Sequence, residues 1–348
     1  MNVGSTKELS PEKRISITPE TSKSFKNLGL NIFIEKGYGE GLGYTDKDFK
    51  DNGAEILNNS DEVLSKSNLI CKVNFPSEKE FTLIKENSYL IVSNYNPEKE
   101  KKFIKNKAKI FALNLLPRIT RAQSMDVLSS QANLAGYRAV IESIYEYQKA
   151  VPMMMTAAGT VPAAKVLVVG AGVAGLQAIA TAKRLGAIVS ATDVRLTAKE
   201  QVESLGGKFL TVEGSENLET KGGYAKEAGE DFKKKQAQML ENAASKSDII
   251  ICTALIPGKP APRIINEKII DNMKSGSVIF DLAVTQGGNS AYSETDKIVV
   301  KKGVKIIGIS NVMNKLPLTA SNLYAKNIFS FVRNLYNKEK REFVINME

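Results

Sequence analysis

Histidine is missing from this chain of 348 residues. It is the side chain whose unperturbed pKa of about 6.5 lets it carry protons at neutral pH, and it is a common metal ligand. Without it, an enzyme must either use another proton carrier or perform a reaction in which the protein exchanges no proton with its substrate. Metal sites that depend on imidazole are excluded as well.

Cysteine is scarce too. Cys71 and Cys252 each lie in an apolar stretch, "NLICKV" and "DIIICTA", and no CxxC pair occurs. This spacing excludes a disulfide framework and a thiolate metal site, and it predicts two buried thiols in a reducing compartment. We expect no metal cofactor.

Long apolar runs are also absent. No segment approaches the roughly 18 consecutive apolar residues of a membrane span. The N-terminal "MNVGSTKELSPEKR" has no apolar signal-peptide core. These observations predict a cytosolic chain, which works at a membrane only if a partner holds it there.

Net charge is strongly positive, at +10, with 25% charged residues. The lysines are dispersed, however, and no basic stripe or recognition motif accompanies them. We therefore expect no nucleic-acid binding. The dispersed lysines, together with frequent Asn and Ile, fit a compositional bias of the source.

The segment from Arg14 to Asn114 alternates β-type and helical patterns, which is typical of a parallel sheet covered by helices. Thr18 is expected to cap a helix that begins at Pro19 and ends at Gly29. The expected strands are "RISI", "NIFIEKG", "NLICKV", "YLIVSN" and "KIFALN". The expected helical or connecting segments are "TPETSKSFKNLG", "TDKDFKDNGAE", "SDEVLSKS" and "PEKEKKFIKNK".

A second series of short apolar runs begins at Lys165, as expected for parallel strands buried on both faces. The runs are "KVLVVG", "AIVSATD", "KFLTV", "DIIICTAL", "SVIFDLAV" and "VKIIGI". We therefore predict an α/β fold of two doubly wound, Rossmann-like domains with parallel sheets. Long helices would join them, and the cleft between them is the expected ligand site.

Two long helical patterns set the predicted domain boundaries. One runs through "SMDVLSSQANLAGYRAVIESIYEYQKA", and the other, "TASNLYAKNIFSFVRNLYNK", is expected to return and complete the first domain. The run "VPMMMTAAG" is expected in the interdomain core, where methionines fill irregular gaps. The predicted regions are a discontinuous N-terminal domain of 1–125 plus about 316–348, a connecting helix of 126–150, and a nucleotide-binding domain of 151–315.

The strongest single motif is "KVLVVGAGVAGLQAIATAKRLGAIVSATD". Gly170, Gly172 and Gly175 form GxGxxG between a strand and an Ala-rich helix, where a dinucleotide pyrophosphate meets the helix N-terminus. Asp193 ends the next strand, so its carboxylate can accept the ribose hydroxyls and repel a 2′-phosphate. The motif predicts NAD(H) binding, and the alternative of a ligand-free glycine turn leaves Asp193 without a role.

A polar loop, "PRITRAQSMDVLSS", precedes the long helix. From the residues alone, Asp126 and Ser129 are expected to satisfy N–H groups at the start of that helix, with Arg118 solvated. From the residues alone, this capping role is favoured over a catalytic role for the loop.

Long stretches of the chain resemble the NAD(H)-binding component (domain I, the first part of the alpha subunit) of proton-translocating NAD(P) transhydrogenases. The resemblance covers nearly the whole chain, and the superfamily includes alanine and saccharopine dehydrogenases. The stretches that carry it are "RITRAQSMDVLSSQANLAGYRAV", "VPMMMTAAGTVPAAKVLVVGAGVAGLQAIATAKRLGA", "TDVR", "KEQVESLGGKF", "KGGYAKEAGEDF" and "TALIPGKPAPRII".

This resemblance implies an activity and a set of partners. The chain would be a homodimer that docks on a membrane-spanning component and faces an NADP(H)-binding component. Hydride would pass directly from NADH to NADP+, coupled to proton translocation by the membrane partner. The resemblance thus implies a cytoplasmic protein attached peripherally to the inner membrane through its partners.

The resemblance also implies site residues. Arg118, Gln123, Asp126 and Ser129 match the family's catalytic constellation, in which Gln123 brings the nicotinamide ring forward. Tyr224 would close a mobile loop, about 213–236, over the nucleotide, although a charged insertion of this kind is usually a solvated loop. The implied cofactor-binding residues are Arg118, Ile119, Thr120, Gln123, Ser124, Met125, Asp126, Gly170, Gly172, Val173, Gly175, Asp193, Val194, Arg195, Gly223, Tyr224, Gln236, Ala254 and Leu255.

Two alternatives remain open. An amino-acid dehydrogenase of alanine or saccharopine type would use the lysine retained as Lys72, but "SYLIVSNYNP" lacks the expected histidine and Thr285 replaces an aspartate. A non-catalytic NAD-binding regulatory module would need the glycine motif but not the set Arg118, Gln123, Asp126 and Ser129. Hydride exchange between two nicotinamides needs no acid or base, so it suits a chain without histidine.

Overall fold

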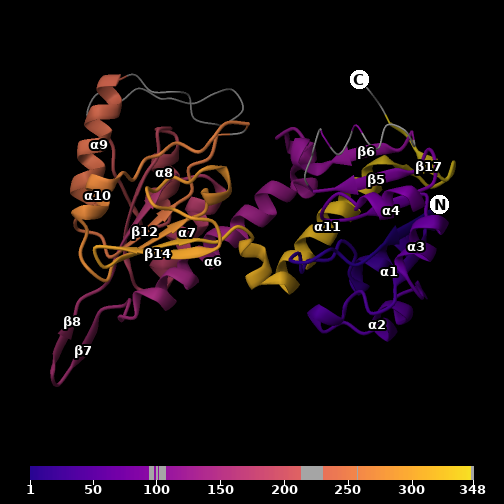
Figure 1. The fold of residues 1–348 in the computed structure, drawn as a ribbon, viewed down its shortest axis with the longest axis horizontal. Coiled ribbons are helices and arrows are strands. Elements are labelled where there is room, and N and C mark those ends of the chain that lie inside the picture. The colour runs from indigo at the N-terminus through magenta and orange to yellow at the C-terminus, as the bar shows by residue number, and fades with distance from the viewer. Residues whose placement is uncertain (94–97, 99–100, 102–106, 213–229, 257, 346–348) are drawn as a thin grey trace. The chain divides into compact units, whose positions relative to one another are not determined.

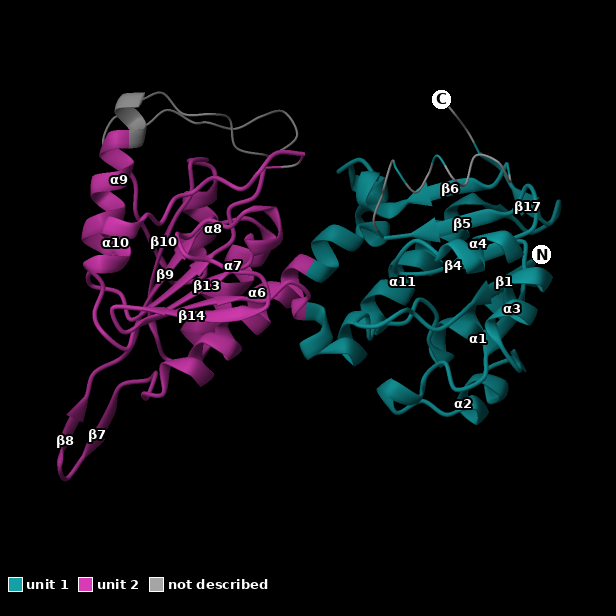
Figure 2. Ribbon diagram, viewed as in Figure 1, with its two compact units in different colours: residues 1–131, 313–348 teal, residues 132–312 magenta. Residues whose placement is uncertain are grey.

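The structure is a computed structural model that describes all residues except 94–97, 99–100, 102–106, 213–229, 257 and 346–348. The chain divides into two compact units, as Figure 2 shows. Unit 1 consists of residues 1–131 and 313–348, and unit 2 of residues 132–312. Unit 1 is therefore built from two separate stretches of the sequence.

Unit 1 is built on a six-stranded sheet with the order β3-β2-β1-β4-β5-β6, in which every neighbouring pair is parallel. Figure 1 labels its strands β5 and β6. Its strands are β1 (Asn2–Ser5), β2 (Asn31–Glu35), β3 (Ala54–Leu57), β4 (Leu69–Cys71), β5 (Tyr89–Val92) and β6 (Lys109–Ala112), with a small pair β16 (Tyr336–Asn337) and β17 (Glu342–Phe343). The helical segments are α1 (Pro19–Asn27), η1 (Glu40–Leu42), α2 (Asp46–Asp51), α3 (Ser60–Lys66), α4 (Glu78–Leu83), η3 (Leu113–Leu115), η4 (Thr120–Met125), η6 (Val312–Lys315) and α11 (Pro317–Leu335).

Unit 2 is built on a seven-stranded sheet with the order β11-β10-β9-β12-β13-β15-β14. Among these described strands, only β14 is antiparallel to its neighbour. The strands are β9 (Lys165–Val169), β10 (Ile188–Thr192), β11 (Lys208–Phe209), β12 (Ile249–Cys252), β13 (Val278–Asp281), β14 (Lys297–Lys301) and β15 (Val304–Gly308). The helical segments are α7 (Val173–Arg184), α8 (Ala198–Ser204), α9 (Glu230–Ala244), α10 (Glu267–Asp271) and η5 (Val284–Gln286). The helix α6 (Val127–Tyr147) runs from one unit into the other.

These sheets confirm the predicted α/β class with parallel strands. The predicted cap of the first helix is also confirmed: the Thr18 side chain accepts from the N–H of Thr21, and Pro19 is the first helical residue. Both cysteines are buried, and burial raises the pKa of each thiol. Among the helices that the structure describes, none is both long and apolar enough to cross a membrane.

Three sequence-based expectations differ from the structure. The stretch "RISI" is not a strand; the first strand of the chain is instead β1, which the sequence pattern does not predict. Strand β3 is also missed, and its first two residues, Ala54 and Glu55, end a segment expected to be helical or connecting. The segment 97–107 lies largely outside the described residues. Of the expected mobile loop, positions 213–229 are likewise outside, and positions 230–236 belong to helix α9.

The methionine run was also wrongly expected in a core. It forms a two-stranded hairpin, β7 (Met154–Thr156) and β8 (Gly159–Val161), which projects from unit 2 (Figure 1). The side chains of Met153, Met154 and Met155 are exposed, the last by 82%. A run of apolar residues therefore lies on the surface.

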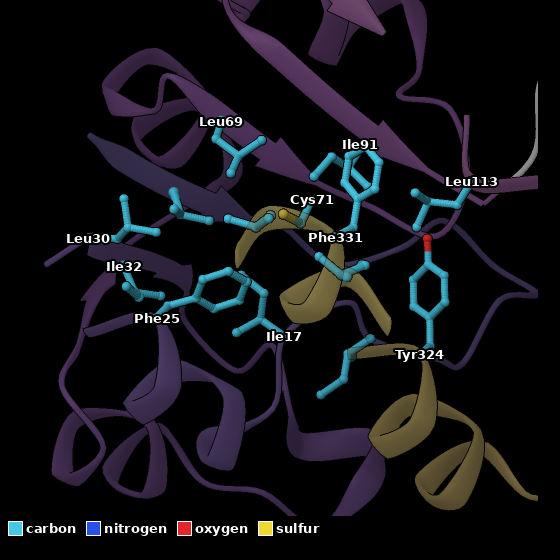
Figure 3. Close-up of a cluster of buried hydrophobic side chains, with 14 of the residues drawn as sticks. Ile17, Phe25, Leu30, Ile32, Leu69, Cys71, Ile91, Leu113, Tyr324 and Phe331 are labelled. Carbon is cyan, nitrogen blue, oxygen red and sulfur yellow. The ribbon is translucent and has the colours of Figure 1, made fainter. Parts of the chain in front are cut away.

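The core of unit 1 depends on the C-terminal helix. In Figure 3, Tyr324 of α11 points toward Leu113 of η3, and Phe331 of α11 points toward Ile91 of the sheet. The Tyr324 hydroxyl donates to the carbonyl oxygen of Lys72 at 2.8 Å. The last helix of the chain thus packs on a sheet made by its first third.

Candidate functional site

The three glycines of the GxGxxG motif occupy different environments in unit 2. Gly170 has φ +96°, and a Cβ there would lie 2.7 Å from Thr253 Oγ1. A Cβ on Gly175 would lie 1.9 Å from the carbonyl oxygen of Gly170, whereas a Cβ on Gly172 would meet no atom within 4 Å. The first glycine is thus required by the turn, the third by close packing, and the second borders open space.

That open space lies at the start of α7. Gly172 is the N-cap residue, and no side chain caps the helix there. Strand β9, which leads into the turn, lies between β10 and β12, so the turn sits where the strand order reverses. In open α/β sheets this is where nucleotides bind, because free N–H groups at the helix N-terminus attract a phosphate.

Asp193 lies against the same turn. Its carboxylate accepts from the backbone N–H of Ala171 at 2.7 Å and forms two side-chain hydrogen bonds with Arg195, each at 2.9 Å. Burial raises the pKa of Asp193, but the hydrogen bonds from Arg195 and Ala171 outweigh it, so the net shift is downward. The carboxylate is therefore ionised at neutral pH, as repulsion of a 2′-phosphate requires.

Val194 and Gln236 lie near Asp193. All three line one shallow depression, together with Thr192 and Met239. Gln236 is half-buried and comes from α9, more than forty positions along the chain. Two separate portions of the predicted cofactor-binding set are thus brought together.

The opposite side of the glycine turn is held by Thr253, which follows the end of β12, and by Asn289, which the sequence pattern does not predict. Thr253 Oγ1 donates to the carbonyl oxygen of Gly170 at 2.9 Å. The buried Asn289 accepts from the N–H of Ala254 at 3.0 Å and donates to its carbonyl oxygen at 2.8 Å. This amide fixes the backbone of a predicted cofactor-binding residue, while the side chain of Leu255 is exposed.

Asn289 follows the double-glycine turn of Gly287 and Gly288, and hydrogen bonds to Asp281 stabilise this turn. The buried Asp281 accepts from the N–H groups of Ala283 and Ser290, and from the Ser293 hydroxyl at 2.7 Å. The sequence signal for this support is the "QGGNS" stretch that follows Thr285. Thr285 itself is exposed on η5.

The loop of unit 1 presents a different set of side chains. Its exposed members among the predicted site residues are Arg118, Ile119, Thr120, Gln123 and Ser124. Met125 is buried in the core of unit 1 and offers little surface. Gln123 is therefore an exposed residue flanked by the buried Ala122 on one side and, after Ser124, by Met125 on the other.

Asp126 and Ser129 contact each other. Asp126 accepts from the Ser129 N–H at 2.9 Å and from the Ser129 hydroxyl at 2.5 Å. This is the capping geometry that the residues alone predict. The Asp126–Ser129 pair thus stabilises the start of α6.

Lys72 is buried, with 1% of its side chain exposed. Its ammonium donates to Thr6 Oγ1 at 2.9 Å, to the Lys7 carbonyl oxygen at 3.1 Å and to Glu80 Oε1 at 2.8 Å. An ammonium has three N–H groups, so all of them are used within the protein. The retained lysine has no donor left for a substrate carboxylate.

Two predicted residues, Gly223 and Tyr224, lie outside the described residues. Within the described ranges, no three His, Cys, Asp or Glu side chains gather into a set that could hold a metal ion. The residues that fit a nucleotide are the glycine turn, with its open helix N-terminus, and the ionised Asp193 beside it.

Sequence comparison places both halves of the chain in one family. The C-terminal domain of the family described as alanine dehydrogenase/PNT matches residues 139–348, and its N-terminal domain matches residues 4–135. The first part of the NAD(P) transhydrogenase subunit alpha of Rhodospirillum rubrum is 51% identical, over 100% of this chain and 94% of that protein. The protein of the same description from Rickettsia prowazekii is 46% identical over 92% of this chain and 86% of its own length.

Structure comparison agrees. The crystal structure of transhydrogenase from Sinorhizobium meliloti superposes with a TM-score of 0.87 at 44% identity, covering 98% of this chain and 96% of that one. An L-alanine dehydrogenase superposes with a TM-score of 0.81 at 22% identity, covering 96% of this chain and 90% of that one, which shows a common fold.

Proposed function

The chain belongs to the alanine dehydrogenase/PNT family, and on that premise we propose that it is the NAD(H)-binding component of a proton-translocating transhydrogenase. NADH bound here passes a hydride directly to NADP+ on a partner component. A membrane-spanning partner couples this transfer to proton movement and holds the chain at the cytoplasmic face of the membrane.

The observation that carries the proposal is a nucleotide turn in a chain that lacks histidine. The open helix N-terminus at Gly172 suits a pyrophosphate, and the ionised Asp193 suits an unphosphorylated ribose. The bound nucleotide supplies a hydride, that is, a hydrogen nucleus with both bonding electrons. Because the second nicotinamide accepts all of it, no protein group must take or give a proton.

In this proposal, the protein's own residues bind, orient and exclude water. Gln123, which is exposed and lies between the buried Ala122 and, after Ser124, the buried Met125, hydrogen-bonds the nicotinamide ribose and brings the ring toward its partner. Arg118, Asp126 and Ser129 orient the same end of the nucleotide. Positioning of this kind can account for several kcal/mol of a reaction barrier, or about 7–11 kcal/mol at best.

The alanine-dehydrogenase alternative is disfavoured by the surroundings of Lys72. A substrate carboxylate would need a free donor from this lysine, and its three N–H groups are bound to Thr6, Lys7 and Glu80. Breaking the buried pair with Glu80 would leave an uncompensated charge. Thr285, at the position of the dehydrogenase aspartate, carries no ionisable group.

We further propose that the chain is a homodimer. The support is the resemblance, together with the exposed methionine hairpin, because an isolated two-stranded hairpin is at best marginally stable in water and exposed apolar side chains favour contact with another surface.

Mixing experiments test the activity. The full chain is combined with the NADP(H)-binding component of a transhydrogenase. Hydride transfer between the two bound nucleotides is then followed by absorbance, with an NAD analogue replacing NAD(H) as the donor or the acceptor. Transfer is expected. NADH binding without transfer would contradict the proposal, and NADH oxidation with pyruvate and ammonia would favour the dehydrogenase.

Gln123→Asn tests the positioning role. The shorter amide cannot reach the same point, so the rate of transfer should fall by about tenfold or more while NADH affinity changes much less. The measurements are single-turnover transfer rates and the dissociation constant of NADH. Equal losses in both would argue against positioning and for simple binding.

A further inference from the structure

One amide on α11 fastens both ends of the segment that follows Gln123. Nδ2 of Asn327 donates to the carbonyl oxygen of Ser124 at 2.9 Å. Its Oδ1 accepts from the hydroxyl of Ser130 at 2.7 Å. Ser124 is the next residue after Gln123, and Ser130 lies in the first turn of α6.

The chemistry of the two partners sets the orientation of this amide. A backbone carbonyl can only accept, so the NH2 group of Asn327 must face Ser124. A serine hydroxyl can donate or accept, so Ser130 adapts to whichever atom remains. The hydrogen bond to Ser124 therefore requires that residue 327 be a donor. The hydrogen bond to Ser130 can form whether residue 327 donates or accepts.

Burial makes the bond to Ser124 important. Asn327 is only 8% exposed, so its amide depends on partners within the protein, and the hydrogen bond to the otherwise exposed Ser124 is half-buried. Met125 and Val127 belong to the same buried cluster as Tyr324 and Ile328 of α11. The buried side of the segment is thus fixed by apolar packing, and its backbone next to Gln123 is fixed by Asn327.

We propose that Asn327 is a positioning residue for hydride transfer. By holding the Ser124 carbonyl, it sets the backbone from which the exposed Gln123 side chain extends. It touches no part of the nucleotide, and its effect reaches the reaction only through Gln123. This inference rests on the proposed function, in which Gln123 positions the nicotinamide.

The decisive variant is Asn327→Asp, which keeps the size of the side chain. Its ionised carboxylate can still accept from Ser130 but has no proton to offer Ser124. The rate of transfer should fall about ten- to hundredfold, with a much smaller change in NADH affinity. Burial raises the pKa of such a carboxyl group, so as the pH is lowered the side chain regains a proton, donates again, and the rate recovers.

Asn322→Asp is the matched control. Asn322 lies on the same helix, and its Oδ1 accepts from the Tyr44 hydroxyl at 3.0 Å. A carboxylate keeps that acceptor, so this variant should transfer hydride at the wild-type rate at every pH. Dividing the Asn327→Asp rate by the control rate removes any pH dependence that belongs to the partner component.

The outcomes separate this inference from the proposed function. No transfer by the wild-type chain would contradict the function itself. Wild-type transfer with equal rates for the two aspartate variants would overturn the role of Asn327. Parallel losses of NADH affinity, transfer and thermal stability in Asn327→Asp, without recovery at low pH, would show a structural role only and overturn it as well.

Should Asn327→Asp fail to fold, Ser130→Ala carries the test. It removes the second partner, together with the 3.2 Å hydrogen bond from the Ser130 hydroxyl to the Val127 carbonyl oxygen, and leaves Oδ1 of Asn327 without its hydroxyl donor, so the amide is held less firmly. A lower rate at unchanged NADH affinity supports positioning. An unchanged rate of hydride transfer overturns the positioning role of Asn327.

Discussion

Gly172 and Gly175 stand three residues apart in one turn, yet a methyl group would meet different surroundings at each. At Gly172 it would enter open space, and at Gly175 it would lie 1.9 Å from the carbonyl oxygen of Gly170. The backbone at Gly172 is also free of the positive φ that only glycine adopts easily. The two positions can therefore separate binding from folding.

We predict that Gly172→Ala folds normally but binds NADH at least about tenfold more weakly, because the methyl group occupies the space through which a pyrophosphate would approach. Gly175→Ala should instead lower the free energy of unfolding, by about 1–3 kcal/mol, through overpacking. Calorimetric titration and denaturant unfolding of both variants check this. Normal NADH binding by a folded Gly172→Ala would show that the open space is not the phosphate site.

The buried pair Lys72–Glu80 should make the stability of the fold depend on pH. The pKa of Glu80 is raised by burial but lowered more by Lys72 and Ser77, so its net shift is downward from 4.5. A carboxyl group shifted downward stabilises the fold above its unfolded pKa, and this contribution is lost as the pH falls through the folded pKa. Glu80→Gln should cost about 3–5 kcal/mol at neutral pH, since a buried lysine loses its counter-charge.

Below pH 4.5 the difference between wild type and Glu80→Gln should shrink, because the wild-type carboxyl group also becomes neutral. Urea unfolding at a series of pH values measures it. The double variant Lys72→Met with Glu80→Gln removes both charges and should recover stability. A difference that stays constant with pH would mean that the charge on Glu80 contributes nothing.

At the scale of elements, local signals were predicted well and distant ones were not. The glycine motif and the cap of α1 depend on neighbours in sequence, so both could be predicted. The stretch "RISI" has a β-type composition, but its backbone N–H groups are satisfied by side chains: Ile15 donates to Ser321, and Ser16 and Ile17 donate to Tyr38. These partners are far away in sequence, so no local pattern reveals them.

The candidate site shows the same limit. The exposed loop and Asp193 could be predicted, because polar residues at a strand or helix end are visible in sequence. Asn289 and Asn327 act through hydrogen bonds to backbone groups across the fold. A lone asparagine in a helix or turn gives no sign of such a partner before the fold is known.

Helix α6 packs closely against the start of α7 at Gly136. A Cβ on Gly136 would lie 2.0 Å from the carbonyl oxygen of Ala174, in the first turn of the helix that begins the nucleotide site. Alanine would favour the helix by about 1 kcal/mol, but the clash with backbone should outweigh this. We expect Gly136→Ala to lower both the melting temperature and NADH affinity.

Gly41→Ala is the control for this substitution, because a Cβ there meets no atom within 4 Å. It should leave melting temperature and affinity unchanged. Differential scanning fluorimetry, with and without NADH, measures both quantities for each variant. If Gly136→Ala behaves like Gly41→Ala, the close approach of the two helices is not a constraint on the site.

At the scale of the whole molecule, the exposed hairpin bears on association. The stretch from Val151 to Ala164, which includes it, carries no charged residue, although charged residues make up 25% of the chain. Replacing Met154 and Met155 by Thr removes apolar surface and keeps β propensity. We predict that light scattering gives a dimer mass for the wild type and a weaker dimer for this variant.

The control exchanges Ile298 and Val300 of β14 for Thr, which removes exposed apolar side chains elsewhere on unit 2. It should dimerise as the wild type does. Equal dimer dissociation constants for both double variants would mean that the hairpin takes no part in association.

The division of unit 1 into two stretches has a consequence for synthesis. Residues 132–312, all of unit 2, leave the ribosome before α11 exists, and domains generally fold as units during synthesis. The sheet of unit 1 must therefore wait, without Tyr324 and Phe331 to cover it, until the last stretch of the chain appears. A chain arrested before Pro317 should hold a folded nucleotide half beside an unfinished first half, exposed to chaperones and proteases.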